Sequence, residues 1–275
     1  MKIAYQGVAG SYSESCAKSN YPKCETIPCK TFDECFEIAS KNNDIKTIIP
    51  ESNKTTGNIG IEYLIFKFRL NIYAEHFYKI SHNLLGLNES KISDITDVYS
   101  HAQALSQSSK FIKKNKFAEH VRADTAGSAK IVSEIKDKTK AAISSSLSAE
   151  IYKMKILAKN IQDNKENFTR FLIMGKDISQ PENKNKSYIT SFLFKLKSKP
   201  AALYSALQGM AINGVNMIKL QSFPEKNSFS SYFFLCEVEG HIDDQKIRNS
   251  LEDLNYHCED MSVLGVFEAD KLRNK

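Results

Sequence analysis

A threonine and an arginine stand side by side before an apolar stretch, in the segment NFTRFLIMG at positions 167–175. The hydroxyl of Thr169 could handle a proton or a leaving group, and the planar guanidinium of Arg170 could bind a carboxylate. The competing interpretation is structural, because threonine suits a strand and arginine can extend its charge into solvent at a strand end. The segment therefore predicts either an ordinary strand end or one wall of a substrate cleft.

Four further segments place polar groups where a strand gives way to a helix. At such junctions, free backbone N–H groups and the helix dipole favour anions. Ser11 with Glu14, and Ser100 with Gln103, also have the spacing of a capping box, so each pair could serve structure alone. Several junctions in one α/β unit would nevertheless converge on a crevice at the strand ends. The four segments are GVAGSYSE (7–14), SHAQAL (100–105), DTAGSAK (124–130) and AAISSSLSAE (141–150).

The sequence carries no signature of a metal centre or a nucleotide cofactor. The glycines of residues 7–14 do not follow the GxGxxG pattern of dinucleotide sites. Six cysteines form no CxxC pair, and the four nearest the start are spaced irregularly for zinc. His101 belongs to no ordered Ser/His/Asp set, and a lone histidine is more often structural than catalytic. We therefore expect no metal and no cofactor.

The composition is that of an ordinary globular protein of 275 residues, with 41% hydrophobic and 25% charged residues. The net charge is +6, but the densest basic cluster, Lys113, Lys114 and Lys116, reads as a solvated helix face. We therefore expect neither nucleic acid nor membrane as a partner. No apolar run approaches the ~20 residues that span a bilayer. The start MKIAYQGVAG reaches a glycine turn too soon for a signal peptide, which predicts a cytoplasmic protein with reduced thiols.

Short apolar runs alternate with amphipathic stretches over the first 175 residues. This alternation predicts an α/β architecture with largely parallel sheets. The expected strands are residues 3–6, 47–50, 97–100, 141–144 and 169–174. The expected helices are residues 11–19, 31–41, 101–115, 125–135 and 148–152.

A polar segment rich in Pro, Asn and Lys, residues 177–188, predicts a linker. Beyond it the order of elements changes to βαββαβ, which is the ferredoxin-like arrangement. The expected strands are 189–196, 215–221, 231–238 and 259–267, and the expected helices are 200–212 and 244–254. The sequence thus predicts two domains joined by a linker.

Six motifs occur in the order seen in prephenate dehydratases, and the tail resembles their ACT regulatory domain. The motifs are AYQGVAGSYSE, PESNKTTGNI, SHAQAL, DTAGSAK, AAISSSLSAEIY and NFTRFLIMG, and the tail contains PAALYSAL and NGVNMIKLQSF. The chain is also similar to plant arogenate dehydratases, which share this architecture. The resemblance implies a two-lobed catalytic domain like periplasmic binding proteins (1–176), a linker (177–188) and a ferredoxin-like ACT domain (189–270).

The reaction implied by the resemblance converts prephenate to phenylpyruvate, water and carbon dioxide, on the route to phenylalanine. It needs no cofactor, and it would use Thr169, Arg170 and Phe171 as catalytic residues. Arogenate, with an amino acid side chain, is the alternative substrate, and a non-catalytic two-lobed binding protein is a further alternative. The substrate-binding residues implied by the motifs are Gly10, Ser11, Asn53, Gly57, Ser100, His101, Gln103, Thr125, Ala126 and Gly127.

The motif PESNKTTG departs from the P-I-E-N-S-x-x-G that is usual in the family. Pro50, Asn53 and Gly57 match in register, but Ser52 stands where Glu is usual and Lys54 where Ser is usual. These two changes leave the roles of Ser52 and Lys54 open and could signal a shifted substrate preference. Ala102 also replaces the usual Pro of SHPQAL, a change that should cost little in a first helical turn.

The resemblance also implies L-phenylalanine as an effector and self-association to a dimer or tetramer. The family's effector segments resemble G-A-L and E-S-R-P, where this chain has AAL at 201–203 and QSFP at 221–224. The added methyl and the lost charges predict weakened inhibition by phenylalanine, although backbone groups near 213–216 could still bind it. The implied effector residues are Ala201, Ala202, Leu203, Asn213, Asn216, Gln221 and Ser222.

Overall fold

The computed structural model describes residues 1–184, 186–225 and 231–273. The chain divides into two compact units. The first comprises Met1–Cys35, Thr47–Ile59 and Phe77–Phe171. The second comprises Phe36–Lys46, Gly60–His76 and Leu172–Lys275.

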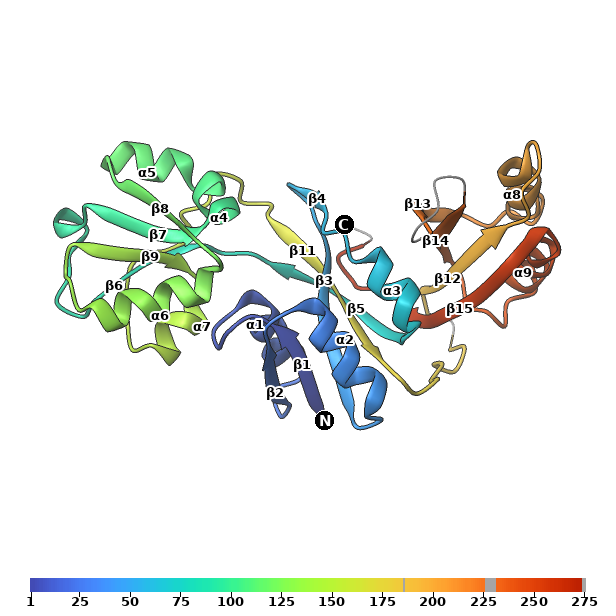
Figure 1. The fold of residues 1–275 in the computed structure, drawn as a ribbon, viewed down its shortest axis with the longest axis horizontal. Coiled ribbons are helices and arrows are strands. Elements are labelled where there is room, and N and C mark those ends of the chain that lie inside the picture. Colours follow the sequence, from blue (N-terminus) through green and yellow to red (C-terminus); the bar gives the residue numbers. More distant parts are fainter. Residues whose placement is uncertain (185, 226–230, 274–275) are drawn as a thin grey trace. The chain divides into compact units, whose positions relative to one another are not determined.

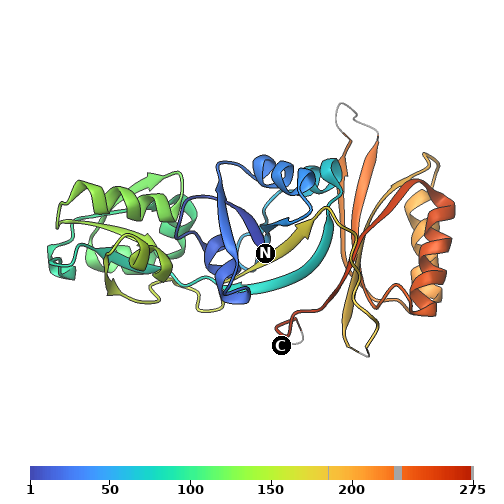
Figure 2. The same cartoon turned by 90° about the horizontal axis from the view of Figure 1, so that it is seen from below.

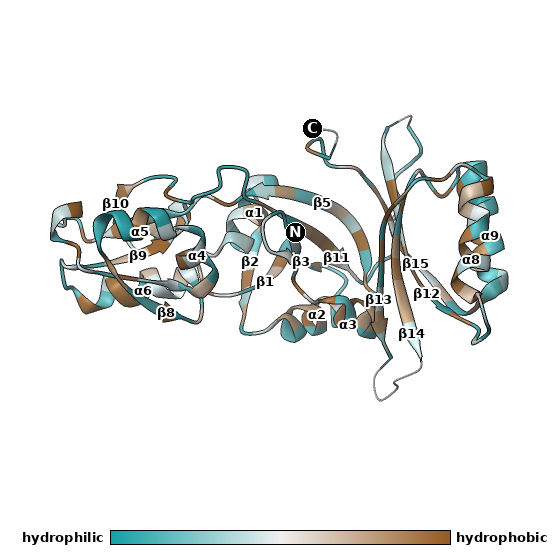
Figure 3. Ribbon diagram, turned by 90° about the horizontal axis from the view of Figure 1, so that it is seen from above, coloured by the Kyte–Doolittle hydropathy of each residue, from teal (hydrophilic) through white to brown (hydrophobic). Residues whose placement is uncertain are grey.

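A six-stranded sheet has the order β2–β1–β3–β11–β5, with the short β4 paired to β3. Its strands are β1 (Lys2–Gln6), β2 (Glu25–Cys29), β3 (Ile45–Asn53), β4 (Gly57–Asn58), β5 (Asn71–Lys79) and β11 (Phe168–Gly175). The associated helices are α1 (Tyr12–Asn20), α2 (Phe32–Lys41) and α3 (Glu62–Phe68). Residues 3–5, 47–49 and 169–175 are buried without interruption, as expected of strands that are covered on both faces. Figure 3 shows the apolar colouring along β11.

A five-stranded mixed sheet has the order β10–β6–β9–β7–β8. The strands are β6 (Asn83–Gly86), β7 (Asp97–His101), β8 (Ala118–Arg122), β9 (Lys140–Ser144) and β10 (Lys155–Ala158). The helices are the 3-10 turn η1 (Ile92–Asp94), α4 (Ala102–Gln107), α5 (Ser109–Asn115), α6 (Thr125–Ile135) and α7 (Ser146–Ile151). β7 runs parallel to β8 and β9, whereas β6 is antiparallel to both β9 and β10.

Alternate residues of this sheet pack into two separate hydrophobic cores, because successive side chains on a strand point to opposite faces. Val98 and Ala141 pack with Leu105 and Ile112, on the face covered by α4 and α5. The adjacent residues Tyr99 and Ala142 pack with Ala129, Val132 and Ala149, on the face covered by α6 and α7 (Figure 1). The two-faced burial makes this a three-layer α/β lobe.

Two chain segments connect the five-stranded sheet to the six-stranded one, after β5 and before β11. They run side by side, because the backbone N–H of Ile80 donates to Asn167 O at 2.8 Å and that of Ile161 donates to His82 O at 2.9 Å. The paired connections give the two-lobed arrangement typical of periplasmic binding proteins, which confirms the predicted fold.

A four-stranded antiparallel sheet of order β13–β14–β12–β15 follows residue 187. The elements are β12 (Tyr188–Leu196), α8 (Ala202–Ile212), β13 (Met217–Pro224), β14 (Tyr232–Glu239), α9 (Gln245–His257) and β15 (Cys258–Glu268). Both helices lie on one face of the sheet (Figure 2), and their apolar sides pack against Phe192, Phe194 and Val238. The predicted ferredoxin-like βαββαβ arrangement is confirmed. Residue 185, in the predicted linker, lies outside the described residues, and so do residues 226–230.

The structure corrects several local predictions. The helix expected over residues 101–115 is two helices, α4 and α5, which are separated at Ser108. The sheets are mixed where largely parallel sheets were expected, because β6 and β10 run against their neighbours. Among the described residues, eight elements were not anticipated: β2, β4, β5, β6, η1, β8, β10 and α3. Over the described residues, no helix is both long and apolar enough to cross a membrane.

Candidate functional site

The hydroxyl of Thr169 lies against the side-chain amide of Asn53. Thr169 is the second residue of β11 and Asn53 is the last residue of β3, and these strands are neighbours in the six-stranded sheet. The Nδ2 of Asn53 donates to Thr169 Oγ1 at 2.9 Å and to Asn167 Oδ1 at 2.9 Å. Thr169 and Asn53 are 6% and 7% exposed. Asn167 and Thr169 meet the same amide because they are two positions apart in the extended chain where β11 begins.

The orientation of the Asn53 amide is set by the backbone that follows it. The backbone N–H groups of Thr55 and Thr56 donate to Asn53 Oδ1 at 2.9 and 3.2 Å. A backbone N–H can only donate, so the oxygen of the amide must face the turn. The NH₂ group therefore faces Thr169, and the Thr169 oxygen acts as the acceptor in this contact.

Two glutamines of α4 bind the same turn. Gln103 Nε2 donates to Thr56 Oγ1 at 2.7 Å, and Gln107 Nε2 donates to Thr55 Oγ1 at 2.9 Å. They can act together because residues four apart lie on one face of a helix. Gln107 Oε1 also accepts from Asn167 Nδ2 at 2.9 Å. The turn after β3 and the segment before β11 are thus both bound by α4 of the other lobe.

His82 extends this polar cluster into the connection between the lobes. Its Nε2 lies 2.9 Å from Gln107 Oε1, and its Nδ1 lies 2.8 Å from the hydroxyl of Tyr12. Burial lowers the pKa of His82, with the hydrogen bond to Gln107 opposing the shift. Burial also raises the pKa of Tyr12 well above its usual value. Both groups are therefore neutral near pH 7, so the cluster works through hydrogen bonds.

Arg170 forms a buried ion pair with Glu51 of β3. Arg170 Nη1 lies 3.2 Å from Glu51 Oε2, and the side chains are 6% and 4% exposed. The hydroxyl of Ser52 donates to the same carboxylate oxygen at 2.7 Å. Ser52, which stands where the family usually has Glu, therefore supports the Glu51 carboxylate.

The glycine turn after β1 is fastened to α7. The hydroxyls of Ser145 and Ser148 donate to Gly10 O at 2.6 and 2.9 Å. Gly10 has a φ of +92°, and a Cβ there would lie 2.8 Å from the Cα of Ser148. A larger residue would therefore separate the turn from α7. The space beside Gly10 is occupied by Ser148 of the chain itself.

Glu14 holds the other side of that turn. Its carboxylate accepts from Gly10 N–H at 2.6 Å and from Thr26 Oγ1 at 2.9 Å, and it pairs with Lys18 at 2.8 Å. Burial alone would raise the pKa of Glu14, but the hydrogen bonds from Lys18, Gly10 and Thr26 outweigh it and hold the pKa below the usual value. Ser11 caps α1 by accepting from Glu14 N–H at 3.3 Å, as the capping-box spacing predicts.

The SHAQAL segment is capped differently from the prediction. His101, not Ser100, is the N-cap of α4, and its Nδ1 accepts from the Gln103 N–H at 3.3 Å. Ser100 is fully buried, and its hydroxyl donates to Ile143 O at 2.6 Å. The strand β7 runs one residue further than expected, which moves the cap to His101.

The DTAGSAK segment begins α6 with residues 125–127, which carry the predicted binding positions Thr125, Ala126 and Gly127. Asp124 is the N-cap, and its carboxylate accepts from Gly127 N–H at 2.5 Å. Ala126 is buried, whereas Thr125 and Gly127 are partly exposed. The remaining substrate position, Gly57, is exposed in β4.

Phe171 lies in the core beyond the polar pair. Its side chain is 1% exposed, and its ring meets that of Tyr78 edge to face with centroids 6.4 Å apart. This environment fits a packing contribution to the position of Arg170.

The predicted effector positions lie in the βαββαβ domain. Ala201 is the N-cap of α8 and has a φ of +57°, in the left-handed region that favours glycine. Asn213 Nδ2 donates to Gly209 O, and Asn216 Nδ2 donates to Glu239 Oε2, both at 2.8 Å. Gln221 Nε2 donates to Glu62 of α3 at 2.8 Å. Ala202 and Leu203 are partly exposed at the start of α8, and Ser222 is exposed on β13.

The structure assigns contacts to residues that sequence reasoning did not single out. Asn167 is two positions from Thr169, so strand periodicity could have indicated it. Gln107 follows Gln103 by one helical turn, so helix periodicity could have indicated it as well. Nothing in the local pattern points to His82 or Glu51, because their partners are distant in sequence.

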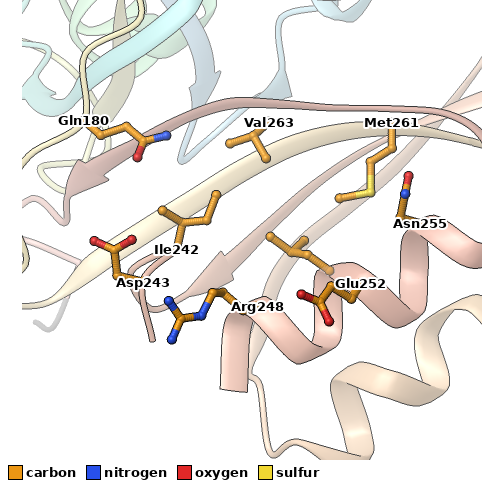
Figure 4. A pocket seen from close by; sticks show the side chains of 9 residues that line it. Gln180, Ile242, Asp243, Arg248, Glu252, Asn255, Met261 and Val263 are labelled. Carbon is orange, nitrogen blue, oxygen red and sulfur yellow. The ribbon is translucent and has the colours of Figure 1, made fainter. Parts of the chain in front are cut away.

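A surface hollow of about 510 Å³ lies in the βαββαβ domain, between α9 and the neighbouring sheet (Figure 4). It shares no residue with the Thr169 cluster. Its lining is Gln180, Ile242, Asp243, Arg248, Leu251, Glu252, Asn255, Met261 and Val263. Across the described part of the chain, no group of three or more His, Cys, Asp or Glu side chains is placed to hold a metal ion.

Comparison with known proteins identifies residues 3–179 with the family model for prephenate dehydratase. The chain is 34% identical to arogenate dehydratase 2 of Petunia hybrida, over 98% of this chain and 72% of that protein. It is 33% identical to the bifunctional N-acyl-homoserine lactone acylase/prephenate dehydratase of Komagataeibacter europaeus, over 99% of this chain and 98% of that protein. A prephenate dehydratase from Arthrobacter aurescens, solved with L-Phe, shares the fold, with a TM-score of 0.87 at 22% identity over 98% of this chain and 90% of that one.

Proposed function

Because the chain belongs to the prephenate dehydratase family, we propose that it converts prephenate to phenylpyruvate, water and carbon dioxide. The observation that carries the proposal is the contact of Asn53 Nδ2 with Thr169 Oγ1 at 2.9 Å. It places a hydroxyl with a defined hydrogen-bond role in the TRF segment that characterises the family.

The reaction requires the protein mainly to position the substrate and its hydrogen-bonding groups. Prephenate carries two carboxylates and a ring hydroxyl. Cleavage of the C–O bond releases the hydroxyl, which takes up a proton to become water. Cleavage of the bond to the ring carboxylate releases carbon dioxide, and its electron pair completes the aromatic ring. Thr169 would donate a hydrogen bond to the departing oxygen, where one positioned donor is worth about 3 kcal/mol.

We propose that Arg170 binds the substrate's carboxylate groups, because its guanidinium is positively charged. Glu51 already neutralises part of that charge, so the N–H groups near the N-termini of α1 and α6 would share the task. The assigned substrate positions follow the motifs, with Gly10 and Ser11 at α1, Ser100, His101 and Gln103 at α4, and 125–127 at α6.

Prephenate and arogenate are distinguished by a direct assay. The purified full-length protein is offered each substrate separately, and phenylpyruvate and phenylalanine are followed with time. We expect prephenate to be consumed. Faster release of phenylalanine from arogenate would make the chain an arogenate dehydratase. Tight binding of prephenate without either product would identify a non-catalytic binding protein.

The name of the Komagataeibacter relative adds one arm to this assay. That protein is named as an acylase as well as a prephenate dehydratase. An N-acyl-homoserine lactone is therefore offered to the same preparation, and the free fatty acid is measured. The Thr169→Val variant separates the outcomes, because we expect it to slow dehydration specifically.

We also propose a division of labour in which residues 1–176 carry catalysis, 177–188 link, and 189–270 form an ACT domain that binds L-phenylalanine. The βαββαβ fold and the altered AAL and QSFP segments support retained but weakened inhibition. A phenylalanine titration of activity tests it: sub-micromolar inhibition contradicts weakening, and no inhibition at millimolar concentration contradicts regulation.

Self-association to a dimer or tetramer belongs to the same proposal and is tested by light scattering after size exclusion, with and without phenylalanine. We place the protein in the cytoplasm. All six cysteines are free, and five of them are buried, as is usual in a reducing compartment.

A further inference from the structure

Four side chains around the proposed catalytic hydroxyl form a closed ring of hydrogen bonds. Asn53 Nδ2 donates to Asn167 Oδ1, and Asn167 Nδ2 donates to Gln107 Oε1, both at 2.9 Å. Gln107 Nε2 donates to Thr55 Oγ1 at 2.9 Å, and Thr55 Oγ1 donates to Asn53 Oδ1 at 2.5 Å. Within the ring, each side chain donates one hydrogen bond and accepts one. The donors therefore all run in the same direction around it.

The direction of the ring is set at two points. The backbone N–H groups of Thr55 and Thr56 require the oxygen of Asn53 to face them. At the opposite side, Gln107 Oε1 lies 2.9 Å from His82 Nε2, and the Tyr12 hydroxyl lies 2.8 Å from His82 Nδ1. A neutral histidine with its proton on Nε2 donates to Gln107 Oε1 and so holds the glutamine oxygen in place. The Tyr12 hydroxyl, which also lies 3.0 Å from Ser81 O, then gives its one proton to Nδ1 over the shorter contact.

This direction decides what Thr169 can do. The two N–H bonds of the Asn53 amide go to Asn167 and to Thr169 Oγ1. A hydroxyl has one proton, and the contact with Asn53 uses a lone pair of its oxygen. The proton of Thr169 is therefore left to be donated to another acceptor. If the donors ran in the opposite direction around the ring, the Asn53 oxygen would face Thr169. The Thr169 hydroxyl would then donate its hydrogen bond to Asn53.

We propose that Gln107 is a positioning residue, which acts through the ring to keep the Thr169 proton directed at the departing oxygen of the substrate. The inference rests on the proposed dehydration. Gln107 is suited to the task because its amide supplies one acceptor, for Asn167 and His82, and one donor, for Thr55. Gln107 also belongs to α4, so the ring contains side chains from both lobes. The direction of the Thr169 proton therefore depends on the arrangement of the lobes.

Gln107→Glu is the sharpest variant. A carboxylate of the same shape still accepts from Asn167 and His82, but it cannot donate to Thr55, so the ring opens. We expect kcat to fall roughly 10- to 100-fold, as for a misplaced catalytic group, while KM stays within about threefold. Gln107→Met, which removes all three hydrogen bonds of the amide at similar volume, should lower kcat as well. The matched control is Gln208→Glu, the same change at an exposed position of α8.

A double variant shows whether Gln107 acts through Thr169. If it does, Gln107→Glu in the Thr169→Val background should lower kcat no further. Additive losses would show that Gln107 acts independently of the hydroxyl and would overturn the inference. An unchanged kcat in Gln107→Glu alone would also overturn it.

The tautomer of His82 provides a readout that does not depend on turnover. Nitrogen-15 NMR of the intact protein should show a neutral ring protonated on Nε2, and the Gln107→Glu carboxylate should favour the protonated ring. A proton on Nδ1 instead would reverse the Gln107 amide and contradict the ring. Absence of dehydration by the unmodified protein would refute the proposed function, whereas these spectra test the ring in either case.

Discussion

The Glu51 carboxylate and the Arg170 guanidinium form a salt bridge of 3.2 Å between β3 and β11, with both side chains almost fully buried. The usual family motif has an apolar residue at the position of Glu51 and a Glu one position later. Adjacent strand residues point to opposite faces, so moving the carboxylate by one position changes the face of β3 that carries it. In this chain the carboxylate lies on the face of Asn53, beside the TRF segment.

Glu51→Gln should strongly destabilise the protein. Removal of one partner of a buried ion pair costs about 3–5 kcal/mol, because the attraction between the two charges no longer offsets their desolvation. Urea unfolding followed by circular dichroism measures the change. Glu37→Gln, which breaks the exposed pair of Glu37 with Lys41, is the control and should change stability little. Equal stability of the two variants would show that the buried pair contributes no more than a surface one.

Thr169→Val should lower kcat by roughly two orders of magnitude, the effect of losing a donor worth about 3 kcal/mol. The shape of the side chain is nearly unchanged, so the fold should persist. Thr190→Val is the matched control, because Thr190 is a buried strand hydroxyl that donates to Gly240 O at 2.8 Å in the βαββαβ domain. Steady-state kinetics with prephenate decide it, and undiminished turnover of Thr169→Val would assign that hydroxyl to structure.

Glu14 should make the stability of the protein depend on acid pH. Its pKa in the folded protein lies below the usual 4.5, so ionised Glu14 favours the folded state. That contribution is complete well above pH 4.5 and is lost as the pH falls through the lowered folded pKa. Urea unfolding between pH 7 and roughly pH 3 should therefore show a shallower decline for Glu14→Gln than for the unmodified protein. Parallel curves would contradict this account of the Gly10 turn.

Ala201→Gly should stabilise the protein by about 1 kcal/mol, because a left-handed residue with a side chain costs roughly 1–2 kcal/mol and glycine recovers most of it. Ala211→Gly in the same helix is the control and should destabilise, by about 1 kcal/mol. Urea unfolding of both variants gives the signs. The same pair, titrated with phenylalanine, tests the proposal that the methyl group of Ala201 weakens effector binding. A destabilised Ala201→Gly would refute the strain argument.

The local patterns of the sequence predicted much of this protein. Helix α6 has the expected bounds, Ser11 caps α1 as its spacing indicates, and β11 contains the expected apolar strand. The order βαββαβ was readable from its apolar strand runs and from the Asn213-Gly214 pair that closes α8. Such features depend on neighbours within a few residues, so the local pattern of apolar and polar residues predicts them. The motif order likewise indicated the family before any geometry was available.

Tertiary structure decided which polar groups meet. Asn53 and Thr169 are separated by 116 positions, and Gln107 and Asn167 by 60, so no local period relates them. Strand direction in the five-stranded sheet was also undetermined, because a strand has the same alternation whether its neighbour is parallel or antiparallel. The sequence by itself therefore specified many of the elements, the family and the threonine. The hydrogen-bond direction that leaves its proton available depends on side chains that only the folded chain brings within 3 Å of one another.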